Sequence, residues 1–516
     1  MMPRRAGAHR SREGSLAVVA GLSLSLFALH MLFNGRYGYF VDELYYLACS
    51  HHLDWGYVDQ APLIAAVTWL ERVTLGDSLH VLRFLPALAA GLKVLLTGLI
   101  ARELGARAYA QVLACVAVIA APLYLGLDNL LTMNAFEPLF WMGSALIAVK
   151  IIKGGDQRLW LLFGVLAGIG LENKHSMLFF GFGFFVGLLL TSERRLLRQP
   201  WIWLGGLLAF LIFLPNLVWE YRQTFPTIEL LRNVQQSGRN VALGSVGFVL
   251  QQVLLMHPLA APLWLAGLWY YFCDPQGRHF RVLGWTYLTI LLCFLVLDGR
   301  VYYLAPAYPM LFAAGAVAFQ RFAERQSRQW LKPAYVAALL VTGALLAPFG
   351  YFPILPVETY IAYARTLHFQ PPRIETHRMG PLPQIYADQF GWKEMAETVA
   401  GVYNKLSPED KQRCAIFGQN YGQAGAIDFF GAKMGLPNAL SGHQSYYYWG
   451  PRGFTGECMI VMDDRTERLS QLFDHYEKVA TVYHPYSMPY QHFDVYLCRR
   501  LHWPLEEIWP QVKKWN

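Results

Sequence analysis

Two adjacent carboxylates, Asp42 and Glu43, stand in the loop that follows the first apolar segment of the chain. They begin a short amphipathic stretch that also contains Tyr46, and this pattern predicts a helix with both acids in its first turn. One interpretation is structural, with Asp42 as the N-cap and Glu43 favoured by the helix dipole. The other is catalytic, because partial removal from water makes a carboxylate more basic and suits it to act as a general base.

Four further loops carry charged or aromatic groups beside apolar segments. Asp59 precedes a second amphipathic stretch, Glu137 and Lys174 lie at the ends of later apolar segments, and Arg300 and Tyr303 follow another. A boundary lysine or arginine often only snorkels towards water. As a set, however, the cations suit an anionic lipid head group and the carboxylates suit an incoming nucleophile.

Metal binding is a weaker interpretation. His51 and His52 lie near Asp42, but adjacent histidines point to different faces of a helix. The seven cysteines form neither a CxxC pair nor a zinc-ligand spacing. We therefore expect no cofactor and do not favour a divalent metal. The sequence leaves open whether Cys414, Cys458 and Cys498 contribute a disulfide.

The composition identifies the class of protein that must position these groups. Of 516 residues, 55% are hydrophobic and only 15% are charged, whereas soluble domains carry about 25% charged residues. This excludes a soluble enzyme, a disordered scaffold and a coiled coil. The net charge of +8 does not indicate nucleic-acid binding, because most basic residues flank apolar segments.

Eleven apolar segments are candidates for membrane-spanning helices, since a span needs roughly 20 residues. The first is interpreted as an uncleaved helix, and the eighth is interrupted by His257 and Pro258. With the N-terminus inside, basic residues number 18 on the inner side and 8 on the outer side, which places the C-terminus outside. The segments are 15–33, 80–100, 108–126, 135–151, 159–172, 175–191, 201–218, 245–272, 281–297, 303–320 and 333–351.

The expected domains are a transmembrane catalytic domain over 1–351 and an extracytoplasmic α/β domain over 352–516. The first outer loop, 34–79, is long and contains amphipathic stretches, so it should lie along the membrane surface. In the C-terminal domain, strands are expected at Ala415–Gly418, Cys458–Met462, Val479–Tyr483 and Asp494–Cys498, and helices at Gly391–Leu406 and Gly422–Met434.

An ordered set of motifs resembles the GT-C glycosyltransferases. The set is Asp42-Glu43 with Tyr46, the DxxPL pattern at 59–63, Glu137-Pro138, Lys174 and YYLAPAYP at 302–309. The most similar groups are bacterial glycosyltransferase family 39 and the aminoarabinose-transferase-like enzymes, within the protein O-mannosyltransferase superfamily. The resemblance covers about residues 1–350.

The resemblance implies specific roles. Asp42 matches the catalytic base and Glu43 its partner, Glu137 a second loop acid and Lys174 the lysine for the donor phosphate, while Tyr303 belongs to the motif of a late periplasmic loop. Tyr46, Asp59 and Arg300 complete the expected substrate-binding set. This chain departs from the aminoarabinose transferases at Gln60-Ala61-Pro62, where they have a lysine before the proline, and at Tyr45, where they have an arginine.

The implied activity is transfer of a sugar, with inversion, from a polyprenyl-phosphate donor to a lipid, glycan or protein acceptor. It implies a multi-pass protein of the bacterial inner membrane that contacts membrane lipids and has a periplasmic C-terminal domain. A transporter or flippase is the main alternative, but transporters place charged residues near the midplane and have internal repeats, and we find no repeat. A purely structural membrane protein would leave the boundary acids unexplained.

The segment 420–451 resembles one branch of the same bacterial family. Its aromatic run, Tyr446–Trp449, suits either stacking on a sugar or lipid or packing in a core or interfacial belt. The sequence leaves both interpretations open, together with the identity of the sugar, the acceptor and the polyprenyl length.

Overall fold

The computed structural model describes residues 4–238, 241, 243–370, 375–463 and 466–516, with side chains from Ser15 onward. Arg239, counted above among the outer basic residues, lies outside the described residues. The chain forms two compact units, which we call the membrane unit and the mixed unit. The membrane unit comprises Met1–Gly35, His80–Leu217 and Ala242–Pro356, and the mixed unit comprises Arg36–Leu79, Val218–Val241 and Val357–Asn516.

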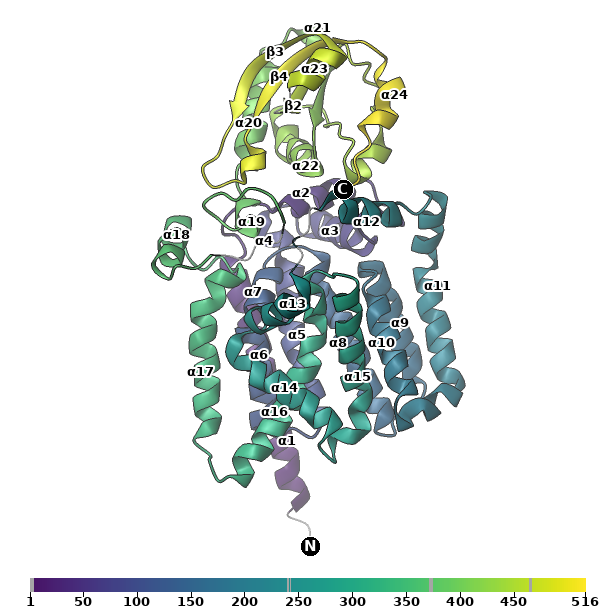
Figure 1. Cartoon of the computed structure of the whole chain (residues 1–516), viewed down its shortest axis with the longest axis vertical. Coiled ribbons are helices and arrows are strands. Elements are labelled where there is room, and N and C mark those ends of the chain that lie inside the picture. The colour runs from purple at the N-terminus through teal and green to yellow at the C-terminus, as the bar shows by residue number, and fades with distance from the viewer. Residues whose placement is uncertain (1–3, 239–240, 242, 371–374, 464–465) are drawn as a thin grey trace. The chain divides into compact units, whose positions relative to one another are not determined.

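The protein is a polytopic α-helical membrane protein (Figure 1). In the described residues, seven helical segments are long and apolar enough to cross a membrane, and up to nine if each of two bent helix pairs counts as one span. The seven are Ser15–Phe33, Leu79–Glu103, Met133–Ile152, Pro200–Arg222, Gly277–Val296, Val301–Arg325 and Leu331–Gly350.

The helices of this unit have well-defined bounds. Those before residue 223 are α1 (Arg4–Phe33), α4 (Leu79–Leu82), α5 (Phe84–Glu103), α6 (Ala108–Ala120), α7 (Pro122–Leu127), α8 (Met133–Ile152), α9 (Leu159–Asn173), α10 (Met177–Leu189), η1 (Ser192–Arg198) and α11 (Pro200–Arg222). The later ones are α13 (Gly244–Leu255), η2 (Pro258–Ala260), α14 (Ala261–Phe272), η3 (Gly277–Phe280), α15 (Arg281–Val296), η4 (Val301–Ala307), α16 (Tyr308–Arg325), α17 (Leu331–Leu346) and η5 (Ala347–Gly350).

All eleven expected segments are helical, but fewer meet the length of a full span. Helices α6 and α9 have 13 and 15 residues, which at about 1.5 Å per residue falls short of the roughly 30 Å hydrocarbon core. The expected interruption at His257 and Pro258 is present, because the helical segments on its two sides meet at 99°. His257 has a φ of 78° there, and Pro258 lacks the N–H needed to continue α13.

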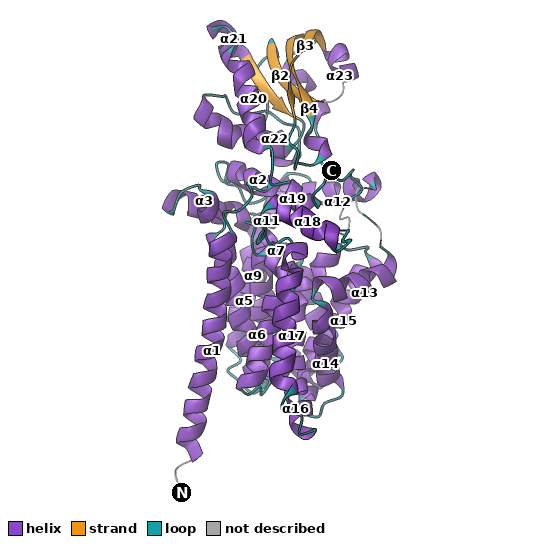
Figure 2. Ribbon diagram, turned by 90° about the vertical axis from the view of Figure 1, so that its left-hand side faces the viewer, coloured by secondary structure: helices purple, strands orange, loops and turns teal. Residues whose placement is uncertain are grey.

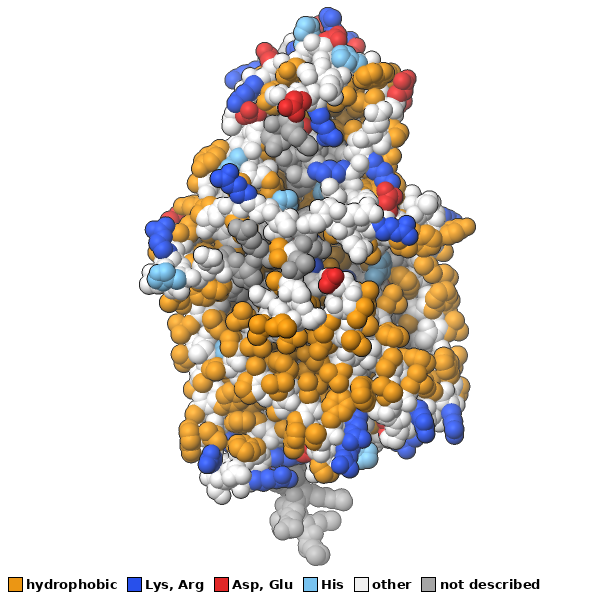
Figure 3. Space-filling model, in the orientation of Figure 1, with side chains coloured by type: hydrophobic (Ala, Val, Ile, Leu, Met, Phe, Trp, Pro, Cys, Tyr) orange, Lys and Arg blue, Asp and Glu red, His pale blue; other side chains and the backbone are white. Residues whose placement is uncertain are grey.

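Small residues allow the membrane helices to approach closely. A Cβ atom on Gly164 of α9 would collide with the backbone of Gly205 in α11, and one on Gly315 of α16 would collide with Leu263 in α14. Large apolar side chains point outward instead, as in Trp203 of α11 and Phe182 of α10. Figure 3 shows hydrophobic side chains covering the visible face of the membrane helices. Lys and Arg side chains gather at the end of these helices that lies near the N-terminus.

The mixed unit contains a four-stranded sheet in the order β1-β2-β4-β3 (Figure 2). Strands β1 and β2 are parallel, and β4 pairs antiparallel with both β2 and β3. The strands are β1 (Cys414–Gly418), β2 (Cys458–Asp463), β3 (Phe473–Val482) and β4 (Phe493–Leu501). The helices are α2 (Val41–Cys49), α3 (Leu63–Thr74), α12 (Pro226–Ser237), α18 (Val357–Thr366), α19 (Gln384–Ala387), α20 (Trp392–Asn404), α21 (Pro408–Arg413), α22 (Tyr421–Phe430), η6 (Gly431–Met434), η7 (Gln444–Trp449), α23 (Thr466–Leu472), η8 (Pro489–Gln491), α24 (Leu505–Ile508) and η9 (Trp509–Val512).

Three of the four expected strands were correctly located, whereas β3 begins six residues earlier than expected. Its first half is charged and exposed because β3 is an edge strand of the sheet, so it lacks the apolar run that is typical of a buried strand. The helices expected at Gly391–Leu406 and Gly422–Met434 are present as α20 and as α22 with η6.

The aromatic run Tyr446–Trp449 joins the separate chain segments of the mixed unit. Trp449 stacks on His52 of the first loop at 4.3 Å, and Tyr448 contacts Trp219 at the end of α11. Tyr447 stacks parallel to Trp509 near the C-terminus. These contacts favour the packing interpretation of the run over the ligand-stacking one.

Candidate active site

Glu43 has a structural contact in the mixed unit. Helix α2 begins after Phe40, and the Glu43 carboxylate accepts a hydrogen bond from the Phe40 backbone N–H at 2.8 Å. Glu43 is fully buried. The alternative that Asp42 is the N-cap is therefore wrong, since Phe40 occupies that position and Glu43 satisfies the N–H group.

Asp42 is thus left to make a different contact. Its half-buried side chain accepts, through Oδ1, a hydrogen bond from the hydroxyl of Tyr421 at 2.8 Å. Tyr421 is the first residue of α22, 379 positions further along the chain. A carboxylate that is partly exposed and held by a phenol is suitably arranged to accept a proton.

Asp59 lies close enough to Asp42 for their charges to interact. The buried Tyr45 donates its hydroxyl proton to Asp59 Oδ1 at 2.9 Å and accepts a hydrogen bond from the Ser445 backbone N–H at 3.1 Å. Burial raises the pKa of Asp59 to about 7, with the Tyr45 hydrogen bond opposing and the Asp42 charge adding to this shift. In this environment Tyr45 supplies a hydroxyl to Asp59 but no positive charge.

Tyr46 is 4% exposed and interacts with the charges of both Asp42 and Asp59. Burial is the main reason that its pKa lies well above the usual range, and the two carboxylates raise it further. Gln60 turns inward and donates to the sulfur of Cys49 at 3.5 Å. The first-loop residues Asp42, Asp59 and Tyr46 therefore form one cluster.

A second cluster lies in the membrane unit, around Lys174 at the end of α9. Its ammonium group donates to Asn134 Oδ1 and to Glu137 Oε2, each at 2.8 Å. Glu137 is 3% exposed and also accepts a hydrogen bond from the hydroxyl of Ser176. Two of the three ammonium protons are thus bound by protein groups among the described residues, and one remains for a ligand.

Tyr303 adjoins this cluster. The Lys174 Nζ atom lies 4.6 Å from the centre of the Tyr303 ring and 5.6 Å from that of Tyr302. Arg300 and Glu137 are both close enough to interact electrostatically with Tyr303. The membrane unit therefore brings together Glu137, Lys174, Arg300 and Tyr303, which are separated in sequence by up to 166 positions.

Several members of these clusters are not among the residues predicted from the sequence. Asn134 stands three residues before Glu137 and Ser176 two after Lys174, so helical spacing and adjacency were available signals. Tyr421 and Ser445 lie in the segment 420–451, but nothing in the local sequence linked them to the acids of the first loop. A further buried pair in the membrane unit, Lys93 and Asp128, is joined at 2.6 Å.

We find no group of three or more metal-binding side chains among the described residues. His51 and His52 are both exposed, and His52 is engaged in the stack with Trp449.

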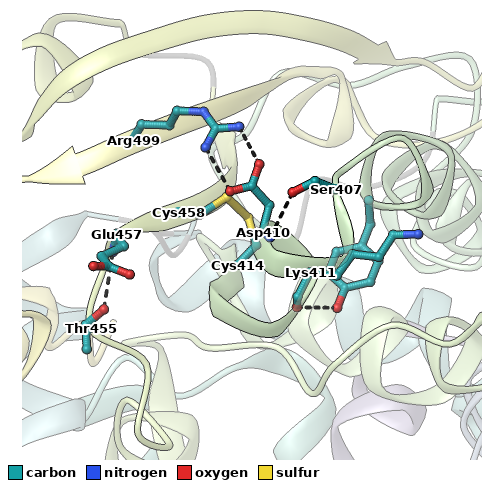
Figure 4. Close-up of a disulfide and its surroundings, with 9 residues drawn as sticks. Ser407, Asp410, Lys411, Cys414, Thr455, Glu457, Cys458 and Arg499 are labelled. Carbon is teal, nitrogen blue, oxygen red and sulfur yellow. Dashed lines mark hydrogen bonds and ion pairs between the residues drawn. A yellow bond between two sulfur atoms is a disulfide. The ribbon is translucent and has the colours of Figure 1, made fainter.

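A disulfide joins Cys414 of β1 to Cys458 of β2 (Figure 4). The two residues are direct neighbours in the parallel pairing of these strands. An ion pair between Arg499 and Asp410 flanks the bond. Structural disulfides are typical of oxidising compartments.

Comparison with known proteins shows which proteins this chain is similar to. Residues 59–219 match the family model of the dolichyl-phosphate-mannose-protein mannosyltransferases. The lipid A galacturonosyltransferase RgtD of Rhizobium johnstonii is 24% identical over 294 residues, which cover 54% of this chain and 59% of that protein. The match therefore spans less than two thirds of the relative's length.

Solved structures match over a larger part of the chain. ArnT from Cupriavidus metallidurans bound to undecaprenyl phosphate covers 94% of this chain and 98% of its own, with a TM-score of 0.62 and 15% identity. The apo form of the same protein matches over the same shares with a TM-score of 0.58 and 14% identity. The chain therefore has the fold of ArnT.

Proposed function

We propose that this protein is an inverting glycosyltransferase that uses a polyprenyl-phosphate-linked sugar as its donor. The acceptor oxygen forms a bond to the anomeric carbon while the bond from that carbon to the phosphate oxygen breaks. The polyprenyl phosphate leaves with the electron pair, and the acceptor proton passes to a base. A single displacement of this kind inverts the anomeric carbon.

The arrangement around Lys174 carries the proposal. Its ammonium group is oriented by Asn134 and Glu137 and keeps one proton for a phosphate oxygen. Arg300 supplies a second cation near the shared neighbour Tyr303. Because the leaving group is a phosphate, these cations stabilise the charge that develops on it without an added acid.

Asp42 is the proposed base. Its carboxylate is half-buried and oriented by Tyr421, whereas Glu43 is fully buried and holds the first turn of α2. We assign Glu43 a positioning role and Asp42 the proton transfer. Tyr46 and Asp59 line the same cluster, and we propose that they help to orient the substrates.

The acceptor is a lipid, a glycan or a protein. The activity named for RgtD, on lipid A, favours a lipid acceptor. For the location we propose a bacterial inner membrane with the mixed unit on the periplasmic side. The disulfide between Cys414 and Cys458 and the excess of basic residues in the expected inner loops both support this orientation.

Turnover by purified protein tests the proposal. The assay follows release of polyprenyl phosphate from a polyprenyl-phosphate sugar in the presence of lipid A. Since a general base contributes typically 10²–10⁴-fold, Asp42→Asn should lower kcat by about that factor. Asp77→Asn makes the same change in the same loop and should retain turnover. Normal turnover by well-folded Asp42→Asn would contradict the assignment of the base.

A further inference from the structure

We propose that the C-terminal segment of the chain supplies the residue that positions the catalytic base, and that this residue is Tyr421. The inference rests on the proposed function, because it concerns the orientation of Asp42 during proton transfer. Its basis is the hydrogen bond from the Tyr421 hydroxyl to Asp42 Oδ1 at 2.8 Å. Tyr421 donates this bond and keeps its proton, so it is a positioning residue.

Tyr421 is itself held rigidly. Its ring stacks on that of His443 with a centroid distance of 4.9 Å and an interplanar angle of 6°, and on that of Tyr45 at 4.7 Å and 30°. Its backbone N–H donates to Nδ1 of His443 at 3.1 Å. Asn420 caps the helix by accepting the Gln423 N–H. The phenol is therefore fixed before substrate binds, as precise positioning requires.

The sequence around Tyr421 explains how α22 comes so close to α2. A Cβ atom on Gly425 would lie 2.8 Å from the backbone oxygen of Leu44, and one on Gly422 would collide with Val41. Glycine at both positions lets the two helices approach until the Tyr421 hydroxyl reaches Asp42. The small residues of the 420–451 motif thus have a specific geometric purpose.

Other contacts from the C-terminal segment fix the surroundings of the same carboxylate. The backbone oxygen of Asp388 accepts the Val41 N–H at 3.1 Å, which anchors the first turn of α2. The Ser445 backbone N–H donates to the Tyr45 hydroxyl, and that hydroxyl donates to Asp59. Within the mixed unit, residues of the C-terminal segment therefore contact Asp42 directly and Asp59 through Tyr45.

The hydrogen bond has two consequences for a base. It limits rotation of the carboxylate, and it favours the ionised form that can accept a proton. Among the described residues, the titratable groups that interact with Asp42 include Tyr46 of α2, Asp59 of the following loop, and Tyr421 and Asp388 of the C-terminal segment. Of these, Tyr421 donates a hydrogen bond to Asp42 Oδ1, so its hydroxyl is the group to remove.

The test is Tyr421→Phe, which retains the ring and both stacks and removes only the hydroxyl. A hydrogen bond to a charged group corresponds to roughly 10- to 150-fold in an equilibrium, so kcat should fall by about that factor. The KM for the polyprenyl-phosphate sugar should be unchanged. The acidic limb of the pH profile of kcat/KM should move to higher pH, because the carboxylate loses a donor that favours its charge.

Tyr446→Phe is the matched control. Tyr446 is buried in the mixed unit, and its hydroxyl donates to Asp428 at 2.8 Å. The control removes an equivalent bond to a different aspartate, so it should leave the acidic limb in place. Thermal unfolding of both variants separates loss of stability from loss of positioning.

The outcomes are distinguishable. In an Asp42→Asn background, Tyr421→Phe should cause no further loss, since the base it positions is absent. Wild-type turnover by Tyr421→Phe beside an inactive Asp42→Asn would overturn this inference and leave the proposed function intact. Equal losses in Tyr421→Phe and Tyr446→Phe with no shift of the acidic limb would make Tyr421 merely structural. Normal turnover by Asp42→Asn would overturn both proposals.

Discussion

The ion pair between Lys174 and Glu137 makes the donor-binding role of Lys174 testable only with a paired substitution. The two side chains are 15% and 4% exposed, and their charged atoms lie 2.8 Å apart. Lys174→Met alone leaves the Glu137 carboxylate buried with Ser176 and without its ion-pair partner. Removing one partner of a buried pair costs about 3–5 kcal/mol, so this variant should lose stability as well as affinity.

The double variant Lys174→Met/Glu137→Gln removes both charges. Replacing a whole buried pair is often neutral, so its unfolding temperature should return close to that of the wild type. Its affinity for polyprenyl phosphate should stay low, because losing a hydrogen bond to a charged group costs about 1.5–3 kcal/mol, roughly 10- to 150-fold. Thermal unfolding and lipid-phosphate binding are measured on the same detergent-solubilised samples.

Lys153→Met is the control, since Lys153 pairs with Glu103 at an exposed site and such pairs contribute at most about 1 kcal/mol. It should leave both measurements near wild type. Recovery of wild-type affinity in the Lys174→Met/Glu137→Gln double variant would refute the reasoning. Lys174 would then serve only to neutralise Glu137.

Three other predictions concern pH, topology and the membrane core. Because the pKa of Asp59 is raised from 3.8 to about 7, the folded chain keeps a proton that the unfolded chain releases, and the free energy of unfolding should fall as pH rises from about 4 to about 7. Asp59→Asn should reduce this fall in thermal unfolding, and an unchanged pH dependence would contradict the shift. A reporter fused after residue 195 should give a cytoplasmic signal and one fused after residue 400 an external signal. Cys414 and Cys458 should react with a maleimide only after reduction. An internal signal at 400 would contradict the expected topology. Lys93→Met should destabilise the protein by about 3–5 kcal/mol, because Asp128 is 1% exposed and bonded to Lys93, whereas Lys93→Met/Asp128→Asn should recover most of that loss in chemical unfolding.

The local elements could be predicted because their signals are short-range. Apolar segments of span length identify membrane helices without knowledge of their partners, and Pro258 marks the bend between α13 and α14 for the same reason. Short, mostly apolar runs located β1, β2 and β4, whereas the exposed edge strand β3 has a weaker pattern. Candidate site residues could also be predicted, because a charged side chain beside an apolar segment is costly and needs a partner or a function.

What the charges do was decided by tertiary structure. The sequence contains Glu137 and Lys174 as separate candidates, and only packing of α8 against α9 turns them into an ion pair. The pattern at Asp42 permits either a helix cap or a base. Asp42 contacts Tyr421, which lies 379 positions away. This contact depends on Gly422 and Gly425, which leave room for α22 to pack against α2. A hydrogen bond acts over about 3 Å of space irrespective of separation along the chain, so composition and periodicity determine the class of protein and its helices, while the folded contacts determine which residues act together.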